Sequence, residues 1–271
     1  MEIVIHVLQC GSVGTDETIP DRSKSKNPYA YTGLLRGSKH KVWLPVYTYL
    51  IQHPKGNILV DTGWHSDVRV NQKKHMTWKL NMASKAKLPV GEAIDEQLLK
   101  LGIKPEELDY VFLTHLDVDH ASGLKLVDKA KHICISEEEY QAKEQGDIRY
   151  HKGLWEGINL DTIKMKSSKY GPFNRSYDVF GDESVILIDL SGHSKGTMGV
   201  IIQNQGKYVI LTSDSGYNSS SWKKLKLPGI TVDRNKAMAA LEWIQKKNTD
   251  PNCLEILATH DPEIIPHTIT L

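Results

Sequence analysis

The sequence has few cysteines, no long apolar stretch and no excess of charge, and each absence excludes a class of protein. Its three cysteines, Cys10, Cys134 and Cys253, form no CxxC pair among 271 residues, which argues against a disulfide framework and favours a reducing compartment. No segment approaches the roughly 20 apolar residues of a membrane-spanning helix. Lys and Arg number 34 and Asp and Glu 33, so a net charge of +1 gives no support to a dedicated nucleic-acid-binding protein.

The start of the chain also lacks the features of an export signal. Glu2 stands where a signal peptide would carry basic residues, and the apolar run at residues 3–8 is too short for one. We therefore expect a cytoplasmic protein that associates with neither a membrane nor a nucleic acid. With 39% hydrophobic and 25% charged residues, the composition is that of an ordinary folded protein. The length predicts one large core, and we expect a single domain over residues 1–271.

Short apolar runs of strand length recur along the whole chain. Strands are predicted at residues 3–8, 44–52, 57–60, 110–114, 132–135, 185–190, 198–203, 208–212 and 254–258. The second and third are separated by His53-Pro54-Lys55-Gly56, which is typical of a turn, so this pair is predicted to form a hairpin. Several runs are continuously apolar, as in strands that are covered on both faces.

Fewer segments have the pattern of helices. They are predicted at residues 92–101, 136–144 and 233–247. Ser136, with Glu139 three residues later, has the pattern of a capping box, and Asp233 is a candidate cap for the third helix. Residues 21–41 and 64–91 have no clear period, which is compatible with lids or binding loops and equally with solvated surface. The order of elements favours stacked sheets with helices outside rather than strict alternation.

Four metal-binding side chains follow directly after the predicted strand at 110–114. They are His115, Asp117, Asp119 and His120, all within six residues. Unpaired carboxylates and imidazoles are costly to bury, so packing alone does not explain such a cluster at the end of a buried strand. A bound divalent cation would offset this cost. The segment therefore predicts a metal site.

Three later strands end in the same way. His193 follows the strand at 185–190, Asp214 the strand at 208–212, and His260 the strand at 254–258. Small residues adjoin each of them and allow close approach of the backbone. Each signal is weak alone, but after the first cluster the three together predict that these side chains meet at one metal centre.

In this order the motifs resemble those of the metallo-β-lactamase superfamily, with its HxHxDH motif, a later His, a bridging Asp and a final His. Within it, the sequence is most similar to the N-acyl-homoserine lactonases. Residues 46–63, the pair Asp214-x-x-Tyr217 and residues 259–262 carry that similarity. The resemblance implies an α/β fold, a four-layer αβ/βα sandwich with the metal ions at one edge between the sheets.

The resemblance also implies a ligand set. His115, Asp117 and His193 would bind one metal ion, and Asp119, His120 and His260 the other, with Asp214 bridging both. Asp117 stands where the family has a second His. The negative charges of three aspartates and a bridging hydroxide balance the charges of two divalent cations. A nearly neutral centre makes the metal ions weaker Lewis acids, and it favours Mn or Fe more than a His-rich site does. We expect two divalent ions, zinc first and Mn or Fe as alternatives, and greater zinc retention in the Asp117→His variant.

The activity implied by the resemblance is that of a quorum-quenching lactonase. A hydroxide that bridges the metals would attack the carbonyl of an N-acyl-homoserine lactone or a related small-molecule lactone or ester. The resemblance makes Tyr217 a donor to the developing oxyanion, and Asp119 is a candidate carrier of the proton to the leaving oxygen. Asp61 is expected to orient a ligand loop, or to act only as a turn cap. We expect a monomer or a homodimer.

Other reactions stay open as alternatives. One branch of the superfamily, the di-iron oxygen and nitric-oxide reductases, has a Glu at the position of Asp117. That branch normally has a flavin-binding domain, and no Gly-rich phosphate loop follows a strand here. Other hydrolases of the fold, such as thioesterases and phosphodiesterases, are further alternatives, as is a module that kept the fold without catalysis.

Overall fold

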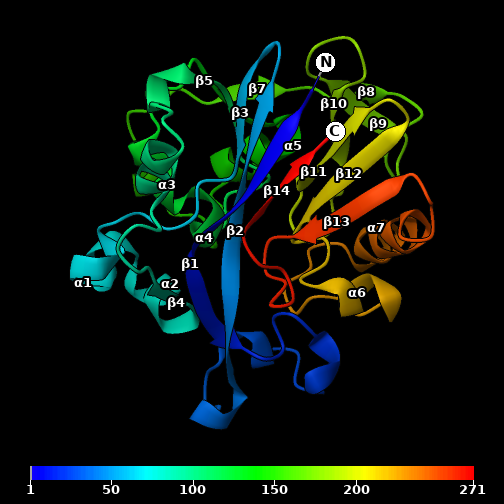
Figure 1. The fold of residues 1–271 in the computed structure, drawn as a ribbon. Helices are drawn as coiled ribbons and strands as arrows, with labels where there is room; N and C mark the ends of the chain where they lie inside the picture. The colour runs from blue at the N-terminus through cyan, green and yellow to red at the C-terminus, as the bar shows by residue number, and fades with distance from the viewer. Residues whose placement is uncertain (1) are drawn as a thin grey trace.

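A computed structural model describes residues 2–271, and its strands form two β-sheets that face each other (Figure 1). Among these residues, the first sheet has the strand order β14-β1-β2-β3-β5-β6-β7, with β4 paired to β1. The second has the order β13-β12-β11-β10-β9-β8. The strands of the first sheet are β1 (Val4–Asp16), β2 (Lys41–His53), β3 (Gly56–Val60), β4 (Lys85–Lys87), β5 (Leu108–Phe112), β6 (His132–Ser136), β7 (Asp161–Ile163) and β14 (His267–Thr270).

The second sheet and the helices complete the order of elements. The strands of the second sheet are β8 (Lys166–Ser167), β9 (Arg175–Asp178), β10 (Val185–Asp189), β11 (Met198–Asn204), β12 (Lys207–Ser213) and β13 (Cys253–Ala258). The α-helices are α1 (Val68–His75), α2 (Trp78–Ala83), α3 (Ile94–Lys100), α4 (Val118–Ala121), α5 (Glu137–Glu144), α6 (Ser219–Lys223) and α7 (Arg234–Lys247). Short 3-10 turns lie between them, at Arg22–Lys24, Ala30–Thr32, Ser38–His40, Pro105–Glu107, Ser122–Leu126 and Lys152–Leu154.

Apolar side chains pack on both faces of each sheet. In β3, Ile58 and Val60 point into the core between the sheets, whereas Leu59 joins the core under the helices of the first sheet. On the outer face of the second sheet, Ile188 of β10 packs with Ala240 of α7. This gives four layers in the order helix, sheet, sheet, helix (Figure 1), so the predicted fold class is confirmed. It also explains the continuously apolar runs, because neither face of these strands meets water.

The strands that precede the predicted site residues all end at the same edge of the sandwich. In the first sheet β3, β5 and β6 are parallel, and in the second β12 is parallel to β13. β10 runs in the direction of β12, because both are antiparallel to β11. The two sheets are tied at this edge by a backbone hydrogen bond of 3.0 Å from Met198 N to Thr114 O.

The predicted strands all occur, but the first is much longer than its apolar pattern indicated. β1 was expected to end at residue 8, and it continues to Asp16. Its second half is rich in small residues and therefore lacks the apolar pattern from which the other strands were predicted. Gly11 has φ 89° at an irregularity in the pairing of β1 with β2, and a Cβ on Gly14 would approach the Trp43 ring to 2.9 Å. The strands β4, β7, β8, β9 and β14 were not predicted.

The three predicted helices correspond to α3, α5 and α7. Ser136 accepts a hydrogen bond of 3.1 Å from Glu139 N, and Asp233 accepts from the N–H groups of Asn235 and Lys236, both at 3.0 Å, so both predicted caps are confirmed. The second contact of the predicted capping box, from the Ser136 backbone N–H to the Glu139 side chain, was wrong, because that side chain contacts other loops. The segment 64–91 contains α1, α2 and β4, and its role as a lid stays a prediction.

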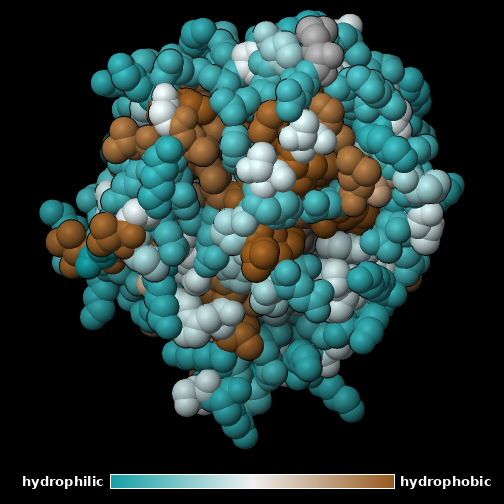
Figure 2. All heavy atoms as spheres, in the orientation of Figure 1, coloured by the Kyte–Doolittle hydropathy of each residue, from teal (hydrophilic) through white to brown (hydrophobic). Residues whose placement is uncertain are grey.

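The face of the molecule in Figure 2 is polar around most of its rim, with apolar atoms in the middle of the view and at its left side, where Figure 1 has α1 and α2. The exposed apolar side chains of these helices are Val70, Trp78 and Met82. None of the helices in residues 2–271 has the length and hydropathy needed to span a bilayer.

Candidate metal centre

All seven predicted metal-binding side chains lie together at the shared edge of the two sheets. They form three overlapping groups, and within each group the potential ligand atoms lie within 4.8 Å of one another. The groups are His115, Asp117 and His193; His115, His120 and Asp214; and Asp119, His120 and His260. The first and third are the two ligand sets that the resemblance implied, and the second connects them.

Asp214 lies between the two sets. Its Oδ1 is 3.3 Å from Nε2 of both His120 and His260, and its Oδ2 is 3.7 Å from Nε2 of His193. Each carboxylate oxygen therefore faces a different set, which is the arrangement that a bridging ligand needs. Asp214 directly follows Ser213, the last residue of β12, whose φ of 51° turns the chain sharply at this point.

The four imidazoles share one hydrogen-bonding pattern. Each uses Nδ1–H as a donor to a protein oxygen, so the lone pair of Nε2 is directed toward the carboxylates. The acceptors are Thr114 Oγ1 for His115 (3.1 Å), Asp61 Oδ2 for His120 (2.8 Å), the Ile230 carbonyl for His193 (3.0 Å) and the Pro45 carbonyl for His260 (2.8 Å). Metal-binding histidines are typically fixed in this way.

Asp61 connects the end of β3 to the ligand loop. It has φ 60°, and its side chain is almost completely buried. Oδ1 accepts a hydrogen bond from Thr114 N, and Oδ2 accepts from Thr114 Oγ1 and from His120 Nδ1–H, each at 2.8 Å. The carboxylate thus holds both the end of β5 and the His120 ring, as expected of a residue that orients a ligand loop.

The chemistry of the buried atoms fits metal ions. Within residues 2–271, four atoms of the cluster are buried and make no hydrogen bond: His115 Nε2, His120 Nε2, Asp117 Oδ1 and Asp214 Oδ1. Such atoms cost free energy unless something pairs with them. Imidazole nitrogens and carboxylate oxygens are ligands for divalent transition metals, and two cations between these groups would satisfy all four atoms.

The electrostatics keep the Asp214 carboxylate ionised. Burial alone would raise the pKa of Asp214, but His260 and His120 hold that pKa well below its usual range. Burial alone would lower the pKa of His120, whereas Asp214 and Asp61 hold it above its usual range. The cluster therefore attracts positive charge, and a metal ion would compete with protons for the same imidazoles.

Tyr217 lies against the cluster as predicted. Its ring stacks on that of His260 with centroids 5.0 Å apart and planes at 19°, and the residue is 4% exposed. Burial, together with the charges of Asp214 and Asp119, holds the pKa of Tyr217 well above its usual value. The phenol therefore keeps its proton and can donate a hydrogen bond to a substrate oxygen.

Glu139 connects two ligand loops, a role that its sequence context does not indicate. The fully buried carboxylate accepts hydrogen bonds from Leu116 N (3.0 Å), Ser194 Oγ (2.8 Å) and Gly196 N (3.0 Å). Gly196 is required at this contact, because a Cβ there would lie 2.3 Å from Glu139 N. The only sequence signal was the spacing from Ser136, which indicates a helix cap rather than a contact with distant loops.

Arg149 is a second residue that sequence reasoning missed. Its Nη1 lies 3.6 Å from Asp117 Oδ2 and donates a hydrogen bond of 3.4 Å to the carbonyl of His193. Burial alone would raise the pKa of Asp117, but Arg149 and the neighbouring imidazoles hold it well below its usual range. Residues 147–151 carry no recognisable motif, so only the tertiary structure brings this guanidinium to the site.

One further group of metal-capable residues lies outside this centre, at His65, Asp67 and His75. The Nδ1 atom of His65 already accepts a hydrogen bond of 3.0 Å from Asp67 N, and the side chain of Asp67 is 67% exposed. His75 Nε2 forms a hydrogen bond of 2.8 Å with Ser122 Oγ. With one lone pair occupied and the carboxylate in solvent, this group is a poor match for a metal ion.

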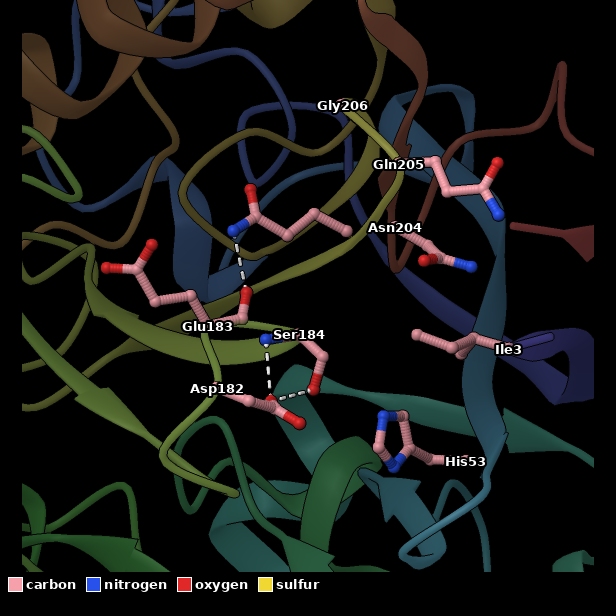
Figure 3. A pocket seen from close by; sticks show the side chains of 9 residues that line it. Ile3, His53, Asp182, Glu183, Ser184, Asn204, Gln205 and Gly206 are labelled. Carbon is pink, nitrogen blue, oxygen red and sulfur yellow. Dashed lines mark hydrogen bonds between the residues drawn. The ribbon is translucent and has the colours of Figure 1, made fainter. Parts of the chain in front are cut away.

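A hollow of about 340 Å³ lies at the opposite edge of the sheets, among the turns that precede β10 and β12 (Figure 3). Its lining includes His53, Asp182 and Ser184 and none of the seven metal-binding residues. Asp182 Oδ1 accepts hydrogen bonds from both Ser184 N and Ser184 Oγ, and Asp182 Oδ2 lies 2.6 Å from Lys55 Nζ. The side chains of Asp182 and Ser184 are thus already paired, and the candidate metal ligands gather at the other edge.

Comparisons with known proteins agree with this geometry. The family model described as the metallo-β-lactamase superfamily matches residues 42–253, a range that holds six of the seven predicted metal-binding side chains. A curated relative, the N-acyl homoserine lactonase AttM of Rhizobium radiobacter, is 26% identical over 231 residues, which cover 81% of this chain and 83% of the relative.

Solved structures are similar over almost the whole chain. An N-acyl homoserine lactone hydrolase with N-hexanoyl-L-homoserine at its catalytic metal centre aligns with a TM-score of 0.76 at 23% identity and covers 96% of this chain and 94% of its own. AidC, a dizinc quorum-quenching lactonase, aligns with a TM-score of 0.64 at 15% identity over 96% and 88% of the two chains. At these identities the likeness shows the fold. With the family model matched over most of the sequence, the chain belongs to the metallo-β-lactamase superfamily and is a metal-dependent hydrolase.

Proposed function

We propose that this protein is a binuclear metal-dependent hydrolase that opens the lactone ring of N-acyl-homoserine lactones or closely related lactones. The observation that carries the proposal is the pair of ligand sets joined by Asp214, with the phenol of Tyr217 beside them. The similarity to curated N-acyl homoserine lactonases supports the choice of substrate class.

In the proposed reaction, Tyr217 and Asp119 act on the substrate. Cations held by the two sets supply Lewis acidity, which polarises an ester carbonyl and makes water nucleophilic at neutral pH. Water adds to the carbonyl carbon, the ring C–O bond breaks, and the proton from the water ends on the former ring oxygen. The Tyr217 hydroxyl donates a hydrogen bond to the carbonyl oxygen as negative charge develops there. Asp119, whose side chain is 14% exposed, carries the proton to the leaving oxygen.

The metal ions that we propose are zinc, with Mn or Fe as alternatives. The donor set of four imidazoles and three carboxylates fits zinc, whereas the carboxylate of Asp117 favours the more oxygen-binding metals. Elemental analysis of protein purified without added metal would decide between them, and we expect about two equivalents per chain.

The test of the function is a substrate panel on protein of known metal content. We expect hydrolysis of N-acyl-homoserine lactones, loss of that activity after chelation, and its return when metal is added. A panel with thioesters and phosphodiesters separates the lactonase from the other hydrolases of the fold. Fully metal-loaded protein that hydrolyses a thioester or a phosphodiester but no lactone would overturn the substrate assignment.

A further inference from the structure

Asp117 differs from the other side chains of the centre because a cationic group lies beside it. Arg149 Nη1 is 3.6 Å from Asp117 Oδ2, and the same oxygen is 3.1 Å from His193 Nε2. In the part of the chain from residue 2 onward, this is the one ion pair between a Lys or Arg and any of the seven metal-binding side chains. The second carboxylate oxygen, Oδ1, is buried without a hydrogen bond and stays available to a metal ion.

The protein holds the Arg149 guanidinium in place. Nη1 donates to the His193 carbonyl at 3.4 Å, and Nη2 donates to the Tyr150 hydroxyl at 3.2 Å. Tyr150 in turn donates to the buried carboxylate of Glu139, which fixes the ligand loops. The Arg149 side chain is only 16% exposed. The guanidinium therefore cannot turn away into solvent, and its position follows that of the loops that carry the ligands.

The charge of Arg149 matters because a metal site lies next to it. A guanidinium keeps its positive charge at every accessible pH, so by itself it would repel a divalent cation across a buried and weakly screened distance. The Asp117 carboxylate offsets that repulsion. Taken together, Asp117 and Arg149 are electrically neutral, as are the imidazoles of His115 and His193 that complete the same ligand set.

We propose that Arg149 is the positioning residue of Asp117 and that the two side chains act as one neutral ligand unit. The inference rests on the metal centre assigned above and is independent of the substrate. It also changes the expectation for Asp117→His. With a neutral imidazole at 117, Arg149 keeps only its ion pair with Asp147, whose Oδ1 lies 3.7 Å from Nε and which is not one of the seven candidate ligands. The positive charge beside the cations is then less well balanced, so metal retention should fall instead of rising.

The test measures how much chelator removes half of the bound metal from purified protein. We expect the Asp117→His variant to need about tenfold less chelator than the unchanged chain, a loss of the size seen when residues around a metal site are altered. In the Arg149→Gln background, Asp117→His should lower the amount of chelator needed by less than threefold. In the Arg149→Lys background, where the positive charge is kept, Asp117→His should again lower the amount of chelator needed about tenfold. Arg36→Gln is the matched control, because Arg36 is 14% exposed and pairs with Asp16 and Glu17 instead.

The outcomes separate this inference from the proposed function. If Asp117→His lowers the amount of chelator needed by the same factor in the Arg149→Gln and Arg149→Lys backgrounds, the proposal that Asp117 and Arg149 act as one neutral unit is wrong, whatever the substrate is. Failure of lactone hydrolysis with the expected pattern of metal retention would overturn only the substrate. Circular dichroism of each variant identifies any that fails to fold. If Arg149→Gln is one of them, the neutral Arg149→Met variant replaces it in the comparison with Arg149→Lys.

Discussion

Tyr217 shows at the scale of a residue how burial and charge set a chemical role. Its ring is packed on His260, so part of its contribution is structural. Its hydroxyl keeps a proton because burial and the carboxylates of Asp214 and Asp119 disfavour the phenolate. The two contributions can be separated, since Phe keeps the ring and removes only the oxygen.

We expect Tyr217→Phe to lower kcat/KM for the lactone about 100-fold, since this is the usual loss when one oxyanion donor is removed. Metal content should not change. Tyr49→Phe is the control, because the Tyr49 hydroxyl is also buried and contacts no hydrogen-bond partner in residues 2–271. A decrease of less than threefold for Tyr217→Phe would assign the residue to packing alone.

At the scale of elements, an ion pair joins α1 to the start of α3. Arg69 donates to both carboxylate oxygens of Glu96, at 2.8 Å and 2.6 Å, and Gly91 N and Ala93 N donate to Glu96 Oε2. The hydrogen bonds from Arg69, followed by those from the backbone, lower the pKa of Glu96 to about 2. The pair holds the segment 64–91, which has little apolar patterning of its own, against the helical layer.

The lowered pKa of Glu96 predicts how this contact depends on pH. Because the folded-state pKa lies below the unfolded value of about 4.3, the stabilisation is present above that value and is lost as the pH falls toward 2. We expect Glu96→Gln to reduce the free energy of unfolding by about 1 kcal/mol at pH 7, with solvent screening taken into account. Urea unfolding at pH 7 and pH 3 should show the difference shrinking.

Glu106→Gln serves as the control for that comparison, because Glu106 is exposed in the turn before β5. It should change the free energy of unfolding by no more than about 0.5 kcal/mol at either pH. A difference for Glu96→Gln that grows as the pH falls would show that the sign assigned to this pair is wrong.

At the scale of the whole molecule, the candidate metal centre lies between the two sheets. His115, Asp117, Asp119 and His120 follow β5 of the first sheet, whereas His193, Asp214 and His260 follow strands of the second. A cation bound between them cross-links the sandwich at one edge. Because the native arrangement brings the ligands together, binding stabilises the folded state, by about 4 kcal/mol at a free metal concentration 1,000 times the Kd.

Removal of the metal should therefore lower the Tm. We expect a decrease of at least about 5 °C in excess chelator, since a loss of a few kcal/mol shifts the Tm of a chain this size by that order. Differential scanning calorimetry with and without chelator would measure it. The Asp214→Asn variant should have a lower Tm than the unchanged chain before chelator is added, and chelator should lower its Tm much less. An unchanged Tm in protein that has lost all its metal would show that the centre does not hold the sheets together.

The apolar runs predicted stacked sheets, and the polar residues at their ends, together with the family resemblance, predicted seven side chains that the structure brings together at one edge. A strand covered on both faces must be continuously apolar, and a His or Asp directly after it is confined to the sheet edge. These features are local in the chain, as are the caps at Ser136 and Asp233. β1 was predicted only in part, because its second half depends on small residues that fit against β2 and not on apolar periodicity.

Arg149 and Glu139 could not be predicted in this way, because their roles depend on contacts between loops far apart in the chain. Arg149 is 32 residues from Asp117 and Glu139 is 55 residues from Ser194. Nothing in the sequence near Arg149 marks it, and the spacing of Glu139 from Ser136 indicates only a helix cap. The sequence by itself determined which side chains meet at the edge of the sheets, since strand and ligand are adjacent in the chain. Only the tertiary structure decided the charge around them, because electrostatic interactions depend on distance in space and not on order along the chain.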